Sequence, residues 1–288
     1  MIPEHENFSC PKIIPQMLAD YEVYLRDEER SANTITKYVR DLKAFFSFIN
    51  GQEFTKTLVL EWKNALTATY APASVNSMLA AVNSFLAWAG FPQYKVKPLK
   101  IQKEIFTKPE KELTREEYLR LIKAADAQNN RRLALLIETI CATGIRVSEL
   151  CFITVDAVKT ARAVVDCKGK TRIVFLPNNL CRALRSYCNE QKIKSGVIFC
   201  TKNGMPLDRS NIWRDMKALC QRAHVQPEKV FPHNLRHLFA RTYYTLEKDI
   251  SRLADLLGHS SIATTRIYTM ESGAEHVRQL ERLGLVPA

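Results

Sequence analysis

A stretch near the C-terminus, residues 233–268, gathers side chains that are able to do covalent chemistry. It holds one arginine of interest, three histidines and a final tyrosine: His233, Arg236, His237, His259 and Tyr268. A free phenol has a pKa of about 10, so roughly one tyrosine in a thousand is ionised at neutral pH. A nucleophilic tyrosine therefore needs cations or a base beside it, and this set supplies both kinds. Taken alone, Tyr268 fits either a nucleophile that attacks an anionic group or a tyrosine that packs in the core, which is the commoner role of a lone tyrosine in a helical segment.

A second arginine is able to complete such a site. Arg146 follows Gly144, which allows the chain to bend after an apolar helix, and Glu149 lies three residues on, where it can brace the guanidinium. His233 and Arg236 share one helix face because three residues separate them. Two guanidinium groups aimed at one point form a forked cage for phosphate oxygens. Taken singly, these groups equally fit a surface ion pair and a buried structural histidine.

Two lysines and one further histidine have less certain places in this picture. Lys168 and Lys170 lie between two apolar strands, expected at 163–167 and 172–176, in a turn that contains glycine. A lysine there can protonate a leaving oxygen or stay in solvent. Strand alternation does not choose between Lys168 and Lys170, because they lie two residues apart and their side chains point to the same side. His237 is one step round the helix from Arg236 and is expected to face elsewhere.

The elements that must position these groups divide the chain into two domains and a linker. Residues 1–97 show helical spacing of apolar residues, with short connections, and predict a small helical bundle. Residues 98–112 are rich in lysine and lack such a period, so they predict a basic linker. Residues 113–288 predict a mostly helical domain with a small sheet. Its expected helices are at about 114–126, 130–142, 178–192, 209–223, 234–247, 250–257 and 273–283, with a short strand at 197–200.

Charge and composition point to a polyanionic partner. The chain of 288 residues has a formal net charge of +12, and acidic and basic residues cancel within residues 1–97. The whole excess therefore belongs to the C-terminal part, which favours nucleic acid. Lysine and arginine side chains of the N-terminal helices are candidate phosphate contacts, namely Lys37, Arg40 and Lys43.

Several classes of protein are disfavoured by the same composition. No apolar run approaches the roughly 20 residues that a membrane helix needs, and the polar, acidic N-terminus is unlike a signal peptide. We therefore expect a cytoplasmic protein with no membrane partner. The eight cysteines show no Cys-x-x-Cys spacing, so neither a metal site nor a disulfide framework is expected.

Four sequence boxes together resemble those of the tyrosine recombinase (phage integrase) family, and most closely its short Xer-type bacterial members. They are Gly-Ile-Arg-Val-Ser-Glu-Leu at 144–150, His-Asn-Leu-Arg-His at 233–237, Leu-Leu-Gly-His at 256–259, and Tyr268. The boxes occur in the family's order, with plausible separations, across about 113–283. The resemblance implies a mainly α fold, with an N-terminal SAM-like core-binding bundle and a C-terminal catalytic domain.

The resemblance also implies a role for each residue that matches a box. It makes Tyr268 the nucleophile, Arg146 and Arg236 the phosphate clamp, Lys168 the acid for the leaving group, His233 the acid/base partner and His259 a phosphate hydrogen-bond donor. Glu149 and Lys170 would support them. The chain departs from the family pattern at Asn234, where aspartate is usual, and in its Cys-Lys-Gly-Lys-Thr-Arg hairpin.

A site-specific recombinase is the function that the resemblance implies. Such an enzyme cleaves and rejoins double-stranded DNA through a 3′-phosphotyrosine and needs no cofactor or metal. A tetramer around two sites is implied, with monomers when free. The alternatives are a type IB topoisomerase, which rejoins the same strand, and a DNA-binding protein that has lost catalysis. The target sequence, the biological outcome and the docking of the tail in cis or in trans stay open.

Overall fold

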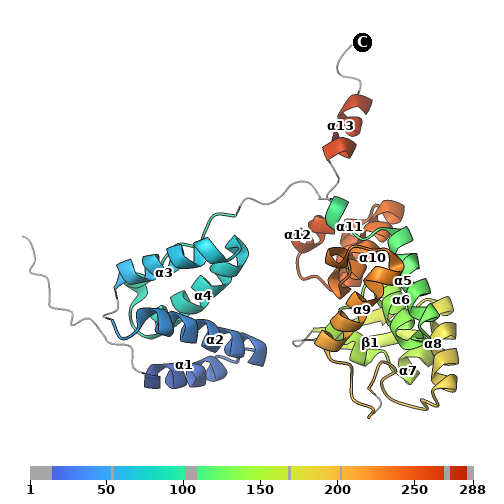
Figure 1. Ribbon diagram of the computed structural model, residues 1–288, viewed down its shortest axis with the longest axis horizontal. Coiled ribbons are helices and arrows are strands. Elements are labelled where there is room, and N and C mark those ends of the chain that lie inside the picture. The colour runs from blue at the N-terminus through green and yellow to red at the C-terminus, as the bar shows by residue number, and fades with distance from the viewer. Residues whose placement is uncertain are drawn as a thin grey trace, which may run out of the picture. The chain divides into compact units, whose positions relative to one another are not determined.

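The computed structural model describes residues 15–52, 55–101, 109–167, 170–201, 203–268 and 273–283. The chain separates into two compact units, Met1–Lys103 and Glu104–Ala288, each of which has its own hydrophobic core. Figure 1 shows both units as largely helical. The mainly α fold predicted from the sequence is therefore confirmed.

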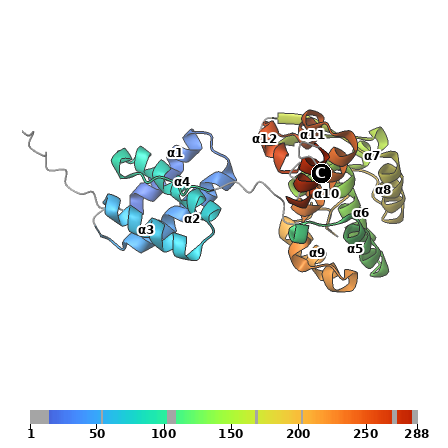
Figure 2. The ribbon, with the colours of Figure 1, turned by 90° about the horizontal axis from the view of Figure 1, so that it is seen from above.

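The described residues of the first unit form a bundle of four helices around aromatic residues. Its helices are α1 (Pro15–Asp27), α2 (Ala32–Ile49), α3 (Lys56–Thr69) and α4 (Pro72–Trp88), followed by the short 3-10 helix η1 (Pro92–Tyr94). Side chains of Ser31 and Thr55 cap α2 and α3 by accepting from backbone N–H groups. Buried Tyr21, Phe45 and Phe85 fill the centre of this bundle, which Figure 2 shows from a second direction.

Two asparagines of α4 bind the chain that leaves this bundle. Asn83 exchanges two hydrogen bonds with the backbone of Val96, with N···O distances of 2.9 and 3.0 Å. Asn76 does the same with the backbone of Leu99, at 2.9 and 2.7 Å. We call these four hydrogen bonds the asparagine ladder. They hold residues 96–99 against α4, so the first part of the predicted linker packs on the first unit.

The second unit is organised around two helices, α6 (Arg131–Thr143) and α10 (Pro232–Glu247), which pack on each other. Most of α6 is buried, because apolar side chains occupy nearly every position from Leu133 to Ile140. The remaining elements surround this pair: η2 (Pro109–Lys111), α5 (Arg115–Ala127), η3 (Val147–Phe152), α7 (Val155–Thr160), α8 (Asn178–Glu190), α9 (Arg209–Ala223), η4 (Pro227–Lys229), α11 (Ile250–Leu257), α12 (Ile262–Thr265), η5 (Arg266–Tyr268) and α13 (Gly273–Arg282).

Among the described residues of this unit, the sheet is one antiparallel hairpin. Strands β1 (Arg162–Cys167) and β2 (Lys170–Phe175) pair with Cys167 opposite Lys170, so the second strand begins two residues earlier than predicted. The expected strand at 197–200 is wrong. Val197 and Cys200 form only isolated bridges, because their partners, Thr154 and Pro206, lie in short irregular segments.

Candidate active site

Arg236 projects from α10 into the interior, where 2% of the residue is exposed. Its guanidinium donates hydrogen bonds to the carbonyl oxygens of Gly144 and Leu257, the latter at 2.7 Å. Burial lowers the pKa of Arg236 to about 10, and the nearby charge of Arg146 acts in the same direction. The group is still a cation at neutral pH, so the fold holds a buried positive charge here.

Arg146 stands at the start of η3, directly after the turn that ends α6. Gly144 makes this turn with a φ of +64°, and a Cβ at this position would collide with Phe239. The Arg146 Nη1 donates to Oε1 of Glu149 at 2.9 Å, and the Arg146 backbone N–H donates to Oε2 at 3.0 Å. Because 39% of the Arg146 side chain is exposed, the guanidinium is both braced and accessible.

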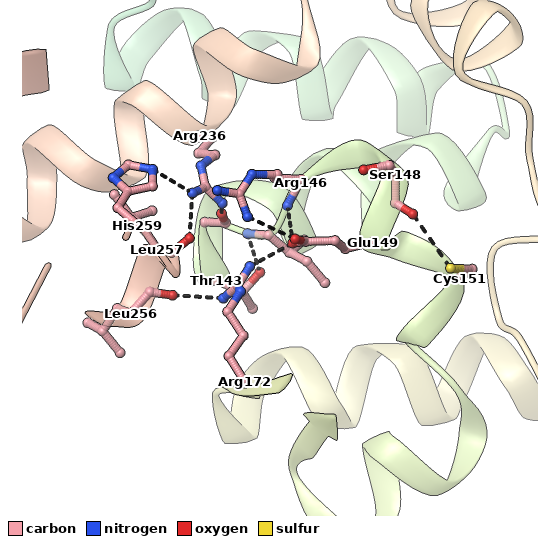
Figure 3. A network of polar contacts seen from close by, with 12 residues as sticks. Thr143, Arg146, Ser148, Glu149, Cys151, Arg172, Arg236, Leu256, Leu257 and His259 are labelled. Carbon is pink, nitrogen blue, oxygen red and sulfur yellow. Dashed lines mark hydrogen bonds and ion pairs between the residues drawn. The ribbon is translucent and has the colours of Figure 1, made fainter. Parts of the chain in front are cut away.

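Arg172 of β2 shares the same carboxylate. Its Nη2 donates to Oε2 of Glu149 at 2.6 Å, and its Nη1 donates to the carbonyl oxygen of Leu256 at 2.8 Å (Figure 3). Burial by itself raises the pKa of Glu149, but the Arg146 N–H and the two guanidinium charges outweigh it, and the pKa is lowered. The ionised Glu149 therefore ties η3 to the hairpin, and Arg172 ties the hairpin to α11.

His259 follows α11, which ends at Gly258 with a φ of +63°. The imidazole Nδ1 lies 2.8 Å from Oγ1 of Thr265, and Nε2 lies 3.0 Å from Nη2 of Arg236. Burial lowers the pKa of His259 to about 4, and the charges of the three arginines described above act in the same direction. The ring is therefore neutral at physiological pH.

Tyr268 lies in η5 with 4% of the residue exposed. Its ring stacks on His259, with centroids 5.9 Å apart, and meets the ring of His237 edge-on at 4.6 Å. The phenol also lies near Arg236, where it raises the pKa of the guanidinium against the effect of burial. The candidate nucleophile and a clamp arginine of the same chain are thus neighbours.

Two histidines of α10 complete this corner, and one corrects an expectation. The rings of His233 and His237 meet edge-on at 4.5 Å. His237 was expected to face elsewhere, which is wrong, because four residues separate it from His233 and place both on one helix face. Burial, and then the charge of Arg236, lowers the pKa of His233, while burial and His233 lower that of His237 to about 4. Both rings are neutral at pH 7 and able to accept a proton.

The structure therefore brings together five of the six predicted catalytic residues: Arg146, His233, Arg236, His259 and Tyr268. The sixth, Lys168, lies outside the described residues, and of Lys170 the structure describes only the backbone, at the start of β2. In the ranges that the structure describes, no three His, Cys, Asp or Glu side chains cluster as metal ligands would.

The predicted phosphate contacts of the first unit lie on α2. Lys37 and Arg40 both bind the carboxylate of Asp41, which is 1% exposed. Lys37 also donates to the carbonyl oxygen of Ser77 at 3.2 Å, while Lys43 is exposed. The carboxylate fixes two of these three cations in place, and their contact with phosphate stays a prediction.

Three residues of the site were not predicted with their present partners. Arg172 binds Glu149, and Thr265 binds His259. Only Thr265 had a signal in the sequence, because it lies three residues before Tyr268 and so belongs to the same segment. The third is Asn234, where the chain departs from the family pattern. Its Nδ2 donates to the carbonyl oxygens of Lys111 at 3.0 Å and Lys229 at 2.7 Å, which an ionised aspartate could not do.

Comparison with known proteins agrees with this geometry. The model of the phage integrase family matches residues 111–275, and that of the phage integrase N-terminal SAM-like domain matches residues 18–90. Tyrosine recombinase XerA of Thermococcus kodakarensis is 30% identical over 278 residues, covering 92% of this chain and 94% of the relative. Tyrosine recombinase XerD of Staphylococcus haemolyticus is 30% identical over 287 residues, covering 92% and 96%.

Solved structures show the same architecture. The crystal structure of XerA recombinase is 27% identical, with a TM-score of 0.51, and the match covers 95% of this chain and 99% of that one. A lambda integrase dimer bound to a core site is 19% identical, with a TM-score of 0.74, covering 91% and 97%; at that identity it supports the fold. The chain therefore belongs to the phage integrase family of tyrosine recombinases, as its sequence boxes predicted.

Proposed function

We propose that this chain cleaves and rejoins DNA strands at specific sites through a covalent bond between Tyr268 and a 3′-phosphate. The observation that carries the proposal is the position of the Tyr268 phenol, which is buried, stacked on His259 and near Arg236 of its own chain. Arg146, held by Glu149 and partly exposed, adds a second guanidinium nearby. Two fixed cations around one phenol suit a reaction whose transition state concentrates negative charge.

In the proposed step, the Tyr268 oxygen attacks phosphorus and the bond from phosphorus to the 5′-oxygen breaks. The phenol proton passes to neutral His233, and Lys168 gives a proton to the departing 5′-oxygen. Arg146 and Arg236 hold the non-bridging oxygens throughout. The reverse reaction, with the 5′-hydroxyl of another strand, restores the phosphodiester and the free tyrosine. The covalent intermediate keeps the bond energy, so the step needs no nucleotide or metal.

Duplex DNA is the proposed partner because the excess positive charge of the chain lies entirely in residues 98–288. A structural neighbour supports an assembly on that partner, since one lambda integrase structure is a tetramer bound to a Holliday junction. We propose a tetramer for this chain also, formed on DNA from monomers. We place its action on DNA in the cytoplasm. In the described parts of the chain, no helix is long and apolar enough to cross a membrane.

The tail helix α13 is the proposed contact between subunits. Val277, Leu280 and Leu283 of this segment are 53%, 66% and 60% exposed, a large apolar surface for so short a helix. The second unit has an apolar cavity of about 290 Å³ between α5, α6 and α10, lined in part by Phe239 and Leu246. Replacing Leu280 by Asp should abolish assembly on DNA in sizing experiments and leave first-strand cleavage intact. Unchanged assembly would contradict this role of the tail.

A covalent-trapping experiment tests the reaction itself. Wild-type protein is incubated with randomised nicked duplexes, from which the cleaved fragment escapes, and adducts that survive denaturation are isolated and sequenced. We expect one enriched sequence and no adduct with Tyr268→Phe. The matched control is Tyr70→Phe, because Tyr70 is a tyrosine of the first unit that is 50% exposed. Adduct formation by Tyr268→Phe, or none by the wild type, would refute the proposal.

A further inference from the structure

The two nitrogens of His259 have different partners, which fixes where its proton lies. Nε2 is 3.0 Å from Nη2 of Arg236, and a guanidinium has hydrogen-bond donors only. Nε2 must therefore accept, without a proton of its own. In a neutral ring the proton then sits on Nδ1, which donates it to Oγ1 of Thr265 at 2.8 Å.

The hydrogen bonds of Arg236 agree with this assignment. Nη2 has two N–H groups, and its two partners are the Leu257 carbonyl oxygen at 2.7 Å and His259 Nε2. Nη1 uses one N–H on the Gly144 carbonyl oxygen. Nε–H and one N–H of Nη1 are left to serve Tyr268 and a bound phosphate. His259 is thus the third protein acceptor, beside the carbonyl oxygens of Gly144 and Leu257, that orients the guanidinium of Arg236.

Thr265 is well placed to enforce this arrangement. It is fully buried and ends α12, three residues before Tyr268, so its hydroxyl belongs to the segment that carries the nucleophile. The surroundings of His259 favour a neutral ring as well. The groups that act on it electrostatically are Arg236, Arg146, Arg172 and His233, and the first three are cations.

We propose that Thr265 is a positioning residue, which holds His259 in the Nδ1–H tautomer so that Nε2 accepts from Arg236 and aligns the clamp. In this arrangement His259 orients the clamp arginine, whereas the sequence boxes imply that it donates directly to phosphate. The hydroxyl also couples the Tyr268 segment to the clamp: displacement of α12 frees the imidazole to exchange tautomers and expose an Nε2–H. The tautomer of His259 does not depend on what the protein does, and only the expected effect on the rate of DNA cleavage rests on the proposed function.

Nuclear magnetic resonance of the imidazole nitrogens tests the tautomer directly. The chain has six histidines, so selective ¹⁵N-histidine labelling gives a spectrum simple enough to assign by comparison with His259→Gln. We expect protonated Nδ1 and unprotonated Nε2 in the wild type and in Thr265→Ser, which keeps the hydroxyl. Thr265→Val, which is nearly isosteric, removes the acceptor of the Nδ1 proton and should raise the fraction of rings that carry the proton on Nε2, although Arg236 still disfavours that form. Thr264→Val is the matched control, because the neighbouring Thr264 is exposed.

Single-turnover cleavage supplies the functional readout. Thr265→Val should slow formation of the covalent adduct up to about tenfold, the factor for one net hydrogen bond, with DNA affinity unchanged. Thr265→Ser should restore most of the rate. A wild-type His259 protonated on Nε2 would overturn the proposal even if Thr265→Val did not fold, and so would an unaltered tautomer in Thr265→Val. Absence of any adduct would refute the proposed function but leave the tautomer result standing.

Discussion

Replacement of Glu149 by glutamine should expose how far the site depends on one buried carboxylate. Glu149 is 1% exposed and accepts three hydrogen bonds, from the backbone and Nη1 of Arg146 and from Nη2 of Arg172. A glutamine oxygen in the place of Oε2 keeps two of them. Its NH₂ group then faces the Nη1 of Arg146, donor against donor, and the two arginines lose their shared negative charge.

The expected cost is about 3 kcal/mol in the free energy of unfolding of the second unit at pH 7, since removing one partner of a buried ion pair leaves the other uncompensated. The pH dependence follows from the lowered pKa of Glu149. A lowered folded-state pKa stabilises the protein above the unfolded pKa of about 4.3, and this stability is lost as pH falls through the folded value. Glutamine at this position should remove that contribution.

Hydrogen exchange read by mass spectrometry suits the measurement, because it separates the two units. Peptides from residues 131–152 should exchange faster in Glu149→Gln at pH 7, and the difference from wild type should shrink as pH is lowered below about 4. Glu247→Gln, at an exposed glutamate of α10, is the control and should match the wild type. Equal protection in Glu149→Gln and wild type at pH 7 would refute the reasoning.

Two further substitutions test contacts that hold the site in place. Asn234→Asp turns a carboxylate towards the carbonyl oxygens that Nδ2 now binds, so urea titration should show a loss of about 2 kcal/mol; no loss would contradict the donor role. Gly258→Ala places a Cβ against the side chain of Arg172. Gly196 also has a positive φ, but a Cβ added there meets no atom within 4 Å. Gly258→Ala should therefore cost about 1 kcal/mol more than Gly196→Ala, and equal costs would exclude the collision.

Local patterns predicted much of the fold. The spacing Thr-x-x-Glu at 114–117 predicts a capping box, and both of its hydrogen bonds are present, because a cap depends only on neighbours in the chain. The hairpin was also predicted. The strand at 197–200 failed since pairing depends on a partner that local apolar rhythm does not reveal.

Long-range contacts explain why the boxes of the site were found and its fine structure was not. Arg236 meets Gly144 and His259 across separations of 92 and 23 residues, and motif order alone indicated that they converge. The tautomer of His259 and the donor role of Asn234 depend on individual atoms of Thr265, Lys111 and Lys229, which no spacing rule specifies. His237 was misplaced by an angular argument that ignored its i, i+4 relation to His233.

The asparagine ladder also fixes the point at which the chain that connects the two units leaves the first unit. Asn76 and Asn83 are seven helical residues apart, a rise of about 10.5 Å, and the three residues from Val96 to Leu99 span about 10 Å when extended. The two lengths match, so both rungs form only in this register, and one residue inserted between Val96 and Leu99 should break a rung. Insertions after Leu99 leave the ladder whole and lengthen the connection by at most about 3.6 Å each. The length of chain that connects the two units is therefore counted from Leu99, the last residue that the ladder holds on α4.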